Sequence, residues 1–177
     1  MSPASCLYII DRLLKSPKGQ DYIDNLNIHI VPVVNSDGYV FTNSTSTRLW
    51  RKNRNPEYST SSDPYCIGVD LNRNFDFHWG GKPEEVCLCA SLKCKVSLSM
   101  IGLGTTDNPC DFQVYRGPRA FSEVELQNLK SYLDSLPIPP ILGLSIHCCK
   151  GWILLPYSYD FNVFPENYEE IVRRDYR

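Results

Sequence analysis

An arginine flanked by two asparagines follows a short apolar run in the middle of the chain. Residues 67–71 predict a buried strand, and Asn72, Arg73 and Asn74 come directly after it. A guanidinium beside an amide side chain can bind a planar carboxylate through parallel, charge-assisted hydrogen bonds. Ligands of open α/β sheets bind at the carboxyl ends of strands. An isolated Asn-Arg-Asn is more often a solvated turn, so other parts of the chain must support a carboxylate site.

Two further groups could take part in chemistry. Arg51 lies in a cluster of cations beside Trp50, within a polar loop over residues 43–64. A loop of this length is more often functional or disordered than a plain connection, although a surface anchor would also explain the Trp and its cations. His147 ends a predicted strand over residues 141–147.

The elements that would position these groups alternate along the chain. We expect helices from Ser2 to about Ser16, from Ser122 to about Leu136, and over 165–177, with Ser122 and Glu125 forming a capping box. Apolar runs predict strands, and a turn with a short extended stretch is expected over 35–42. The strands are expected at 26–34, 67–71, 141–147 and 152–155. This pattern predicts an α/β fold with a mixed, mostly parallel central sheet and flanking helices.

Length and composition describe an ordinary globular protein. The chain has 177 residues, of which 42% are hydrophobic and 21% charged, and this size suggests one domain. A net charge of -2 gives no reason to expect a nucleic-acid or acidic-membrane partner, and no apolar run is long enough to span a bilayer.

The cysteines and a glycosylation sequence favour an oxidising compartment. The chain has 8 cysteines whose spacing is no clean zinc pattern, and Asn43-Ser44-Thr45 is a glycosylation acceptor sequence. The N-terminus lacks the features of a signal peptide, because Asp11 interrupts its apolar stretch and no basic region precedes it. The sequence therefore indicates either a cytosolic protein or one whose true N-terminus is missing.

Residues 84–105 look foreign to the rest of the chain. They contain Cys87, Cys89 and Cys94 in a low-charge run without a clear period. A thiolate metal cluster is one interpretation, but we favour a loop insertion or an artefact of gene annotation.

Five motifs, taken in order, resemble the zinc metallocarboxypeptidases of the carboxypeptidase A/B type, peptidase family M14. They are residues 29–42, 49–52 and 68–75, Tyr115–Pro118 leading into Phe121–Glu123, and residues 145–147. The resemblance covers most of the chain outside residues 84–105. It implies that residues 1–177 form the central part of a catalytic domain, incomplete at both ends, whose family removes C-terminal residues from peptides.

The resemblance carries over to individual positions. Asn72 and Arg73 resemble the pair that binds the substrate's terminal carboxylate, and Arg51 resembles the arginine that stabilises the oxyanion. His147 resembles one of three zinc ligands, and Asp70 resembles a carboxylate that orients another zinc-bound histidine. Cys66 and Cys110 match a pair that forms a disulfide in relatives.

The departures from the family pattern limit what we expect of this chain. The His-x-x-Glu motif that supplies two zinc ligands does not occur in the sequence, the family's catalytic Glu lies beyond the point that matches Arg177, and Cys149 replaces an aromatic residue. The family carries one zinc ion per full domain, and we expect weak or absent zinc binding, no cleavage and poor folding here.

The intact protein is expected to be extracellular and to act on peptides or proteins with a free C-terminus. The alternative is a non-catalytic relative that binds peptide C-termini. The preferred C-terminal side chain is not determined by these residues.

Overall fold

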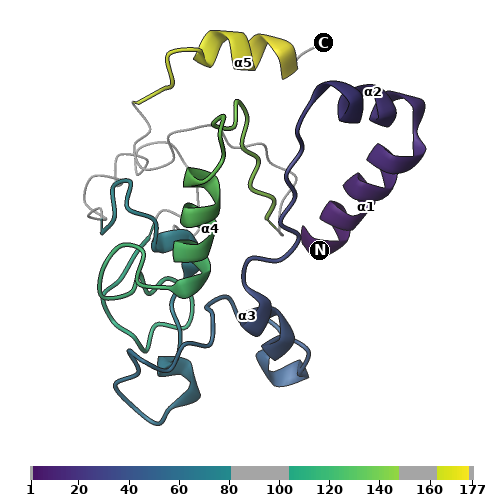
Figure 1. Ribbon diagram of the computed structural model, residues 1–177. Helices are drawn as coiled ribbons and strands as arrows, with labels where there is room; N and C mark the ends of the chain where they lie inside the picture. Colours follow the sequence, from purple (N-terminus) through teal and green to yellow (C-terminus); the bar gives the residue numbers. More distant parts are fainter. Residues whose placement is uncertain (1, 81–103, 148–162, 176–177) are drawn as a thin grey trace, which may run out of the picture.

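A computed structural model describes residues 2–80, 104–147 and 163–175 (Figure 1). The predicted strand at 152–155 and nearly all of the predicted insertion at 84–105 lie outside these residues. In chain order the described elements are α1 (Ser2–Lys15), α2 (Pro17–Asn25), α3 (Ser36–Phe41), the 3-10 turns η1 (Thr45–Thr47), η2 (Pro64–Cys66) and η3 (Leu71–Arg73), then α4 (Val124–Asp134) and α5 (Tyr168–Asp175).

The N-terminal helices form a hairpin, with α1 packed against α2 (Figure 1). The predicted end of the first helix near Pro17 is confirmed, and Ser16 caps the next helix by accepting a hydrogen bond from the Gly19 amide at 3.0 Å. Cys6 of α1 is buried, whereas Leu7 and Leu14 are 60% and 68% exposed. The hairpin therefore leaves much of its apolar surface uncovered.

The predicted mixed, mostly parallel sheet is wrong for the described chain. No strand occurs in the described ranges, where an isolated parallel bridge between Thr106 and Tyr115 is the β-type pairing. A helix satisfies its own backbone, but a strand exists only when a second segment accepts and donates its hydrogen bonds. The apolar runs were predicted as strands, but their sequence does not contain the partners that a strand needs.

In residues 67–71, other contacts replace some of the hydrogen bonds that neighbouring β-strands exchange. The Val69 amide donates to the side-chain Oδ1 of Asn53 at 2.8 Å, while the Val69 carbonyl accepts from the Asn53 amide at 2.9 Å. Gly68 has a φ of 87°, and a Cβ there would lie 2.0 Å from the Asn53 carbonyl oxygen. A side-chain amide thus takes the place that a neighbouring strand would have.

Two other predicted strands are extended and exposed, and we call residues 26–34 and 141–147 the extended arms. Ile28 and Val31 of the first arm are 41% and 49% exposed, and Ile141 and Leu144 of the second are 93% and 80% exposed. Nδ1 of His29 and the hydroxyl of Tyr132 in α4 are hydrogen-bonded at 2.6 Å, which links the first arm to the rest of the molecule. The extended arms therefore bury little apolar surface.

The turn predicted over residues 35–42 is a helix, α3. Asn35 is its N-cap, and the Asn35 Oδ1 accepts from the Gly38 amide at 3.0 Å. Asn, Asp and Gly favour both turns and helix starts, so the local sequence did not separate the two.

The helix predicted from Ser122 is confirmed as α4, but its N-cap is Glu123 and the capping box does not form. The C-terminal helix is confirmed as α5. The buried apolar centre lies beside α4 and consists of Cys66, Val69, Leu71, Tyr115 and Leu126. None of the described helices has the length and apolar character needed to cross a membrane.

Candidate functional site

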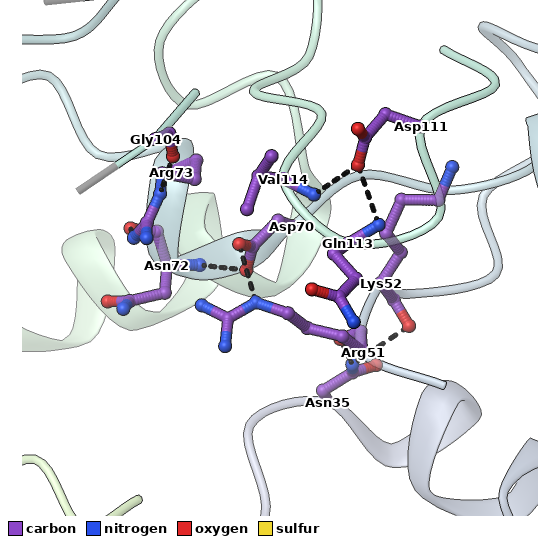
Figure 2. Close-up of polar contacts among 10 residues, drawn as sticks. All are labelled: Asn35, Arg51, Lys52, Asp70, Asn72, Arg73, Gly104, Asp111, Gln113 and Val114. Carbon is purple, nitrogen blue, oxygen red and sulfur yellow. Dashed lines mark hydrogen bonds and ion pairs between the residues drawn. The ribbon is translucent and has the colours of Figure 1, made fainter. Parts of the chain in front are cut away.

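Asp70 is the centre of the candidate site. It caps η3, and its Oδ1 accepts from the Asn72 amide at 3.1 Å. Its Oδ2 accepts from the Arg51 Nε at 2.7 Å, and the Asp70 side chain is 3% exposed (Figure 2). One buried carboxylate therefore orients both an arginine from a distant loop and the turn that carries Asn72 and Arg73. We call Arg51, Asp70, Asn72 and Arg73 the Asp70 site.

Arg51 keeps part of its guanidinium for a ligand. Its side chain is 35% exposed and is held through Nε. Within the described residues, no hydrogen bond occupies its Nη1 and Nη2 atoms. Figure 2 shows these atoms on the same side of Asp70 as the Asn72 amide. Because the backbone amide of Asn72 is bonded to Asp70, one ligand could meet the Arg51 guanidinium and the Asn72 side chain.

The Arg73 guanidinium is held by backbone carbonyls. Its Nε donates to the Gly104 carbonyl at 2.7 Å and its Nη1 donates to the Asn72 carbonyl at 3.0 Å. Burial lowers the pKa of Arg73, Asp70 opposes that shift and Arg51 adds to it. An arginine stays charged under all ordinary conditions, so the Asp70 site holds two cations and one carboxylate. This excess positive charge favours an anionic ligand.

His147 comes near the same charges. Its Nε2 lies 3.2 Å from the Ser145 hydroxyl. The residue is at the surface, yet partial burial of its ring lowers its pKa, as do Arg51 and Arg73, while Asp70 acts in the opposite direction. The structure thus brings Arg51, Asp70, Asn72 and Arg73 together, while the contact that links His147 within the described residues is its bond to Ser145.

The described residues do not fit a zinc centre. Across residues 2–80, 104–147 and 163–175, no three His, Cys, Asp or Glu side chains are placed to hold a metal ion. The charged neighbours of His147 are two arginines and an aspartate that already binds Arg51. Cationic neighbours oppose a divalent ion, and a lone imidazole holds it weakly. Asp70 therefore orients Arg51 here, and its predicted contact with a zinc-bound histidine stays untested.

Lys52 joins the site to a disulfide. Cys66 and Cys110 are bonded to each other, and the Lys52 Nζ donates to the carbonyls of Tyr65 at 2.8 Å and Pro109 at 2.7 Å. Lys52 is completely buried. Burial lowers its pKa to about 8, with Asp111 opposing and Arg54 adding to that shift. A surface anchor is one of the explanations that the sequence allows for the cations beside Trp50, and burial of Lys52 is not among its predictions.

A buried polar core contacts the residues on both sides of Asp70, and the sequence did not predict it. Its members are Asn53, Asn74, Ser122 and Glu123, and the half-buried Glu125 borders them. Asn53 donates through Nδ2 to Glu123 Oε2 at 2.7 Å and Glu125 Oε1 at 3.0 Å. Asn74 donates to Ser122 Oγ at 2.9 Å and accepts from the Glu123 amide at 3.2 Å. Asn53 follows the motif at 49–52, and Glu123 ends the motif at Phe121–Glu123. Both are polar residue types, which are usually exposed, so their burial was not predicted.

Gly117 allows this core to close. Its φ is 80°, and a Cβ there would lie 2.6 Å from Ser122 Oγ and 2.7 Å from Asn74 Nδ2. The Asn74 amide also donates to the Arg116 carbonyl at 2.8 Å. Any side chain at Gly117 would therefore separate η3 from the start of α4.

Comparison with known proteins identifies the family of the chain. The family profile described as zinc carboxypeptidase matches residues 1–176. The chain belongs to the zinc carboxypeptidase family, and the resemblance found in its motifs is confirmed.

Individual relatives match almost the whole chain. It is 32% identical to mast cell carboxypeptidase A of Rattus norvegicus over 178 residues, which cover 98% of this chain and 36% of that protein. It is 33% identical to carboxypeptidase B of Rattus norvegicus over 97% of this chain and 35% of that protein. It is 32% identical to a zinc carboxypeptidase of Simulium vittatum over 90% of this chain and 44% of that protein. The chain thus spans between about a third and a half of these relatives.

Proposed function

We propose that the Asp70 site binds the C-terminal carboxylate of a peptide, and that the intact protein hydrolyses the C-terminal peptide bond as a metallocarboxypeptidase. One observation carries the proposal: Asp70 orients Arg51 at 2.7 Å and also fixes the turn bearing Asn72 and Arg73. Both arginines thereby lie around one buried carboxylate, with positive charge in excess.

The charge of the site gives a reason for selecting chain ends. An internal peptide bond is neutral, whereas a free C-terminus carries a carboxylate that an arginine can bind with two hydrogen bonds. Arg73 and the side chain of Asn72 are proposed to hold this carboxylate. Selectivity then comes from the charged group, because a peptide ending in a neutral amide cannot form charge-assisted hydrogen bonds with an arginine as strongly as a carboxylate does.

Arg51 is proposed to act on the next carbonyl of the substrate. Its Nε is fixed by Asp70, which leaves Nη1 and Nη2 to donate to an oxygen that becomes negative during hydrolysis. A donor held in place before the reaction lowers the barrier because it needs no reorganisation. His147 lies in the field of Arg51, Asp70 and Arg73, at the edge of this site.

The relatives are zinc enzymes by name, but the described residues do not assemble a zinc site. For this chain by itself, the proposal is therefore peptide binding with weak or no zinc retention and no cleavage. The substrates are peptides or proteins with a free C-terminus. An extracellular location for the intact protein is supported by the Cys66–Cys110 disulfide.

Peptide titration tests this function. Calorimetry would compare the tetrapeptide Ala-Ala-Ala-Phe with the same peptide ending in an amide, and Ala-Ala-Ala-Lys with its amide covers a basic end. The native chain is expected to bind the free acids at least about tenfold more tightly, roughly 1.4 kcal/mol. Arg73→Ala should abolish that preference. Equal affinity for acid and amide in both peptide pairs would refute the proposal.

Matched measurements separate binding from chemistry. Arg12→Ala removes an exposed arginine of α1 and should leave the acid preference intact. Elemental mass spectrometry of the purified chain should give far less than one zinc per chain, and the acids should release no free amino acid. Near-stoichiometric zinc or released phenylalanine would overturn the claim about this chain while leaving the carboxylate site in place.

A further inference from the structure

The backbone that carries Arg51 is fixed at two points remote from any ligand. We propose that Lys52 and Asn35 are positioning residues that set the Arg51 guanidinium against Asp70 before a peptide binds. The inference rests on the proposed carboxylate site, since it states how that site is made ready. Neither residue is placed to touch the substrate.

Lys52 fixes the first point. Its Nζ donates to the carbonyls of Tyr65 and Pro109, at 2.8 Å and 2.7 Å. Each of these residues directly precedes one cysteine of the Cys66–Cys110 disulfide. The ammonium therefore joins the same two loops that the covalent bond joins. Lys52, which is next to Arg51, is thereby attached to the two loops that the disulfide links.

The surroundings of Lys52 show that its place is specific. The side chain is 0% exposed, and its Nζ lies 5.6 Å and 5.9 Å from the ring centroids of Trp50 and Tyr115. Asp111 favours its charged form and Arg54 opposes it. A lysine is seldom buried without partners, and here two carbonyls and two aromatic faces take the place of water. A flexible surface lysine would have none of these.

Asn35 fixes the second point. Its Nδ2 donates to the carbonyls of Arg51 at 3.2 Å and Lys52 at 3.1 Å (Figure 2). Its Oδ1 accepts from the Gly38 amide and so caps α3. One amide group therefore attaches the two successive carbonyls on either side of Lys52 to the start of a helix.

These two attachments bear on the guanidinium itself. The Arg51 side chain has several rotatable bonds, and ordering them on binding has an entropic cost. With its backbone fixed and its Nε bonded to Asp70, most of that ordering is complete before a ligand arrives. Loss of either attachment should therefore weaken the Arg51–Asp70 contact, and with it the binding of the free acid.

The first readout needs no peptide. Exchange of the Arg51 Nε–H with solvent, followed by NMR, reports its hydrogen bond to Asp70. Lys52→Met keeps an unbranched buried side chain without the donor, and Asn35→Ser keeps a helix cap but cannot reach the two carbonyls. Each variant should exchange this proton at least about tenfold faster than the native chain. Unchanged exchange in both variants would overturn the proposal.

The second readout is the affinity ratio between Ala-Ala-Ala-Phe and its amide. A variant that is merely less folded loses affinity for both peptides alike, whereas a misplaced Arg51 lowers the ratio. We expect the ratio to fall about fivefold to tenfold in each variant. Lys130→Met is the matched control, because Lys130 pairs with Asp134 on the surface of α4 and should change neither readout.

Failure of the positioning role can be told apart from failure of the carboxylate site. If the native chain shows no acid preference, the carboxylate site is refuted, and the exchange measurement still decides whether Lys52 and Asn35 position Arg51. If the native chain shows the preference and both variants retain it, the positioning role is refuted. If Lys52→Met does not fold, Asn35→Ser decides the question.

Discussion

The Asp70 site with its polar core and the two extended arms contrast sharply in how they are stabilised. Around Asp70, side chains of Asn53, Asn74 and Lys52 bind backbone groups, and these residues are at most 1% exposed. In the extended arms, apolar side chains such as Ile141, at 93% exposed, face solvent. Both regions contain apolar runs whose sequence predicts strands.

The difference shows that polar side chains can complete local structure where apolar ones cannot. Asn53 supplies an acceptor to the Val69 amide, and residues 67–71 also bond through their backbone to Asn53, Asn55 and Tyr115. Residues 141–147 contain Ser145 as a polar side chain before His147, and it bonds to that histidine instead of the backbone. An apolar segment is stabilised only by burial, which requires a partner. The following predictions test this contrast, from the largest expected effect to the smallest.

Asn53→Ala should have the largest effect on stability. It removes an acceptor from the buried Val69 amide and donors from Glu123 and Glu125. The unsatisfied Val69 amide and the loss of two hydrogen bonds to carboxylates should lower the free energy of unfolding by about 3–5 kcal/mol. Urea unfolding measures this. Asn25→Ala, which removes an exposed bond to the Asp21 carbonyl in α2, should change it by less than about 0.5 kcal/mol.

Loss of the disulfide should come next. Cys66 and Cys110 are 44 residues apart, and a loop of that length predicts about 2–4 kcal/mol of stabilisation by limiting the unfolded chain. Cys66→Ala with Cys110→Ala should lower the urea midpoint accordingly. Cys6→Ala, at a buried free cysteine of α1, is the comparison, and an equal loss there would mean that the two regions contribute alike.

The buried lysine should make stability depend on pH. Burial lowers the pKa of Lys52 from 10.5 to about 8, so between these values the unfolded chain binds more protons than the folded chain. Stability should therefore rise with pH from about 8, by up to about 3 kcal/mol near pH 10. Below pH 8 both states bind the proton and the cost of burying the charge is fully present.

The pH dependence is measured as a difference between the native chain and Lys52→Met, both unfolded in urea from pH 7 to 10. The variant should lack the rise. Because Tyr58 and Tyr115 titrate in both chains, the difference isolates Lys52. A parallel rise in both chains would show that Lys52 is solvated, and would remove it from the buried region.

A polar substitution in an extended arm should have the smallest effect. Leu144 is 80% exposed, so Leu144→Gln should change the free energy of unfolding by less than about 0.5 kcal/mol. The matched change in the buried centre, Leu126→Gln at 1% exposed, should lower it by at least about 3 kcal/mol. A loss above about 2 kcal/mol at Leu144 would mean that the arm is buried, and would break the contrast.

The candidate site was more predictable than the fold around it. Arg51, Asp70, Asn72, Arg73 and His147 were found because each belongs to a motif, and the family membership is confirmed. What could not be predicted was that Asp70 would bind Arg51, since these residues are far apart in sequence and each had a separate expected role. The polar core was missed because burial of Asn53 and Glu123 depends on segments that meet in space.

The sequence by itself determined the family, the helices α1, α4 and α5, and the residue types of the Asp70 site, because motifs and helices depend on short-range order. The tertiary structure decided which polar groups are buried, that Lys52 lies between two carbonyls beside the disulfide, and that extended segments stay unpaired. Strand pairing and burial depend on partners distant in the chain, and no local pattern contains them.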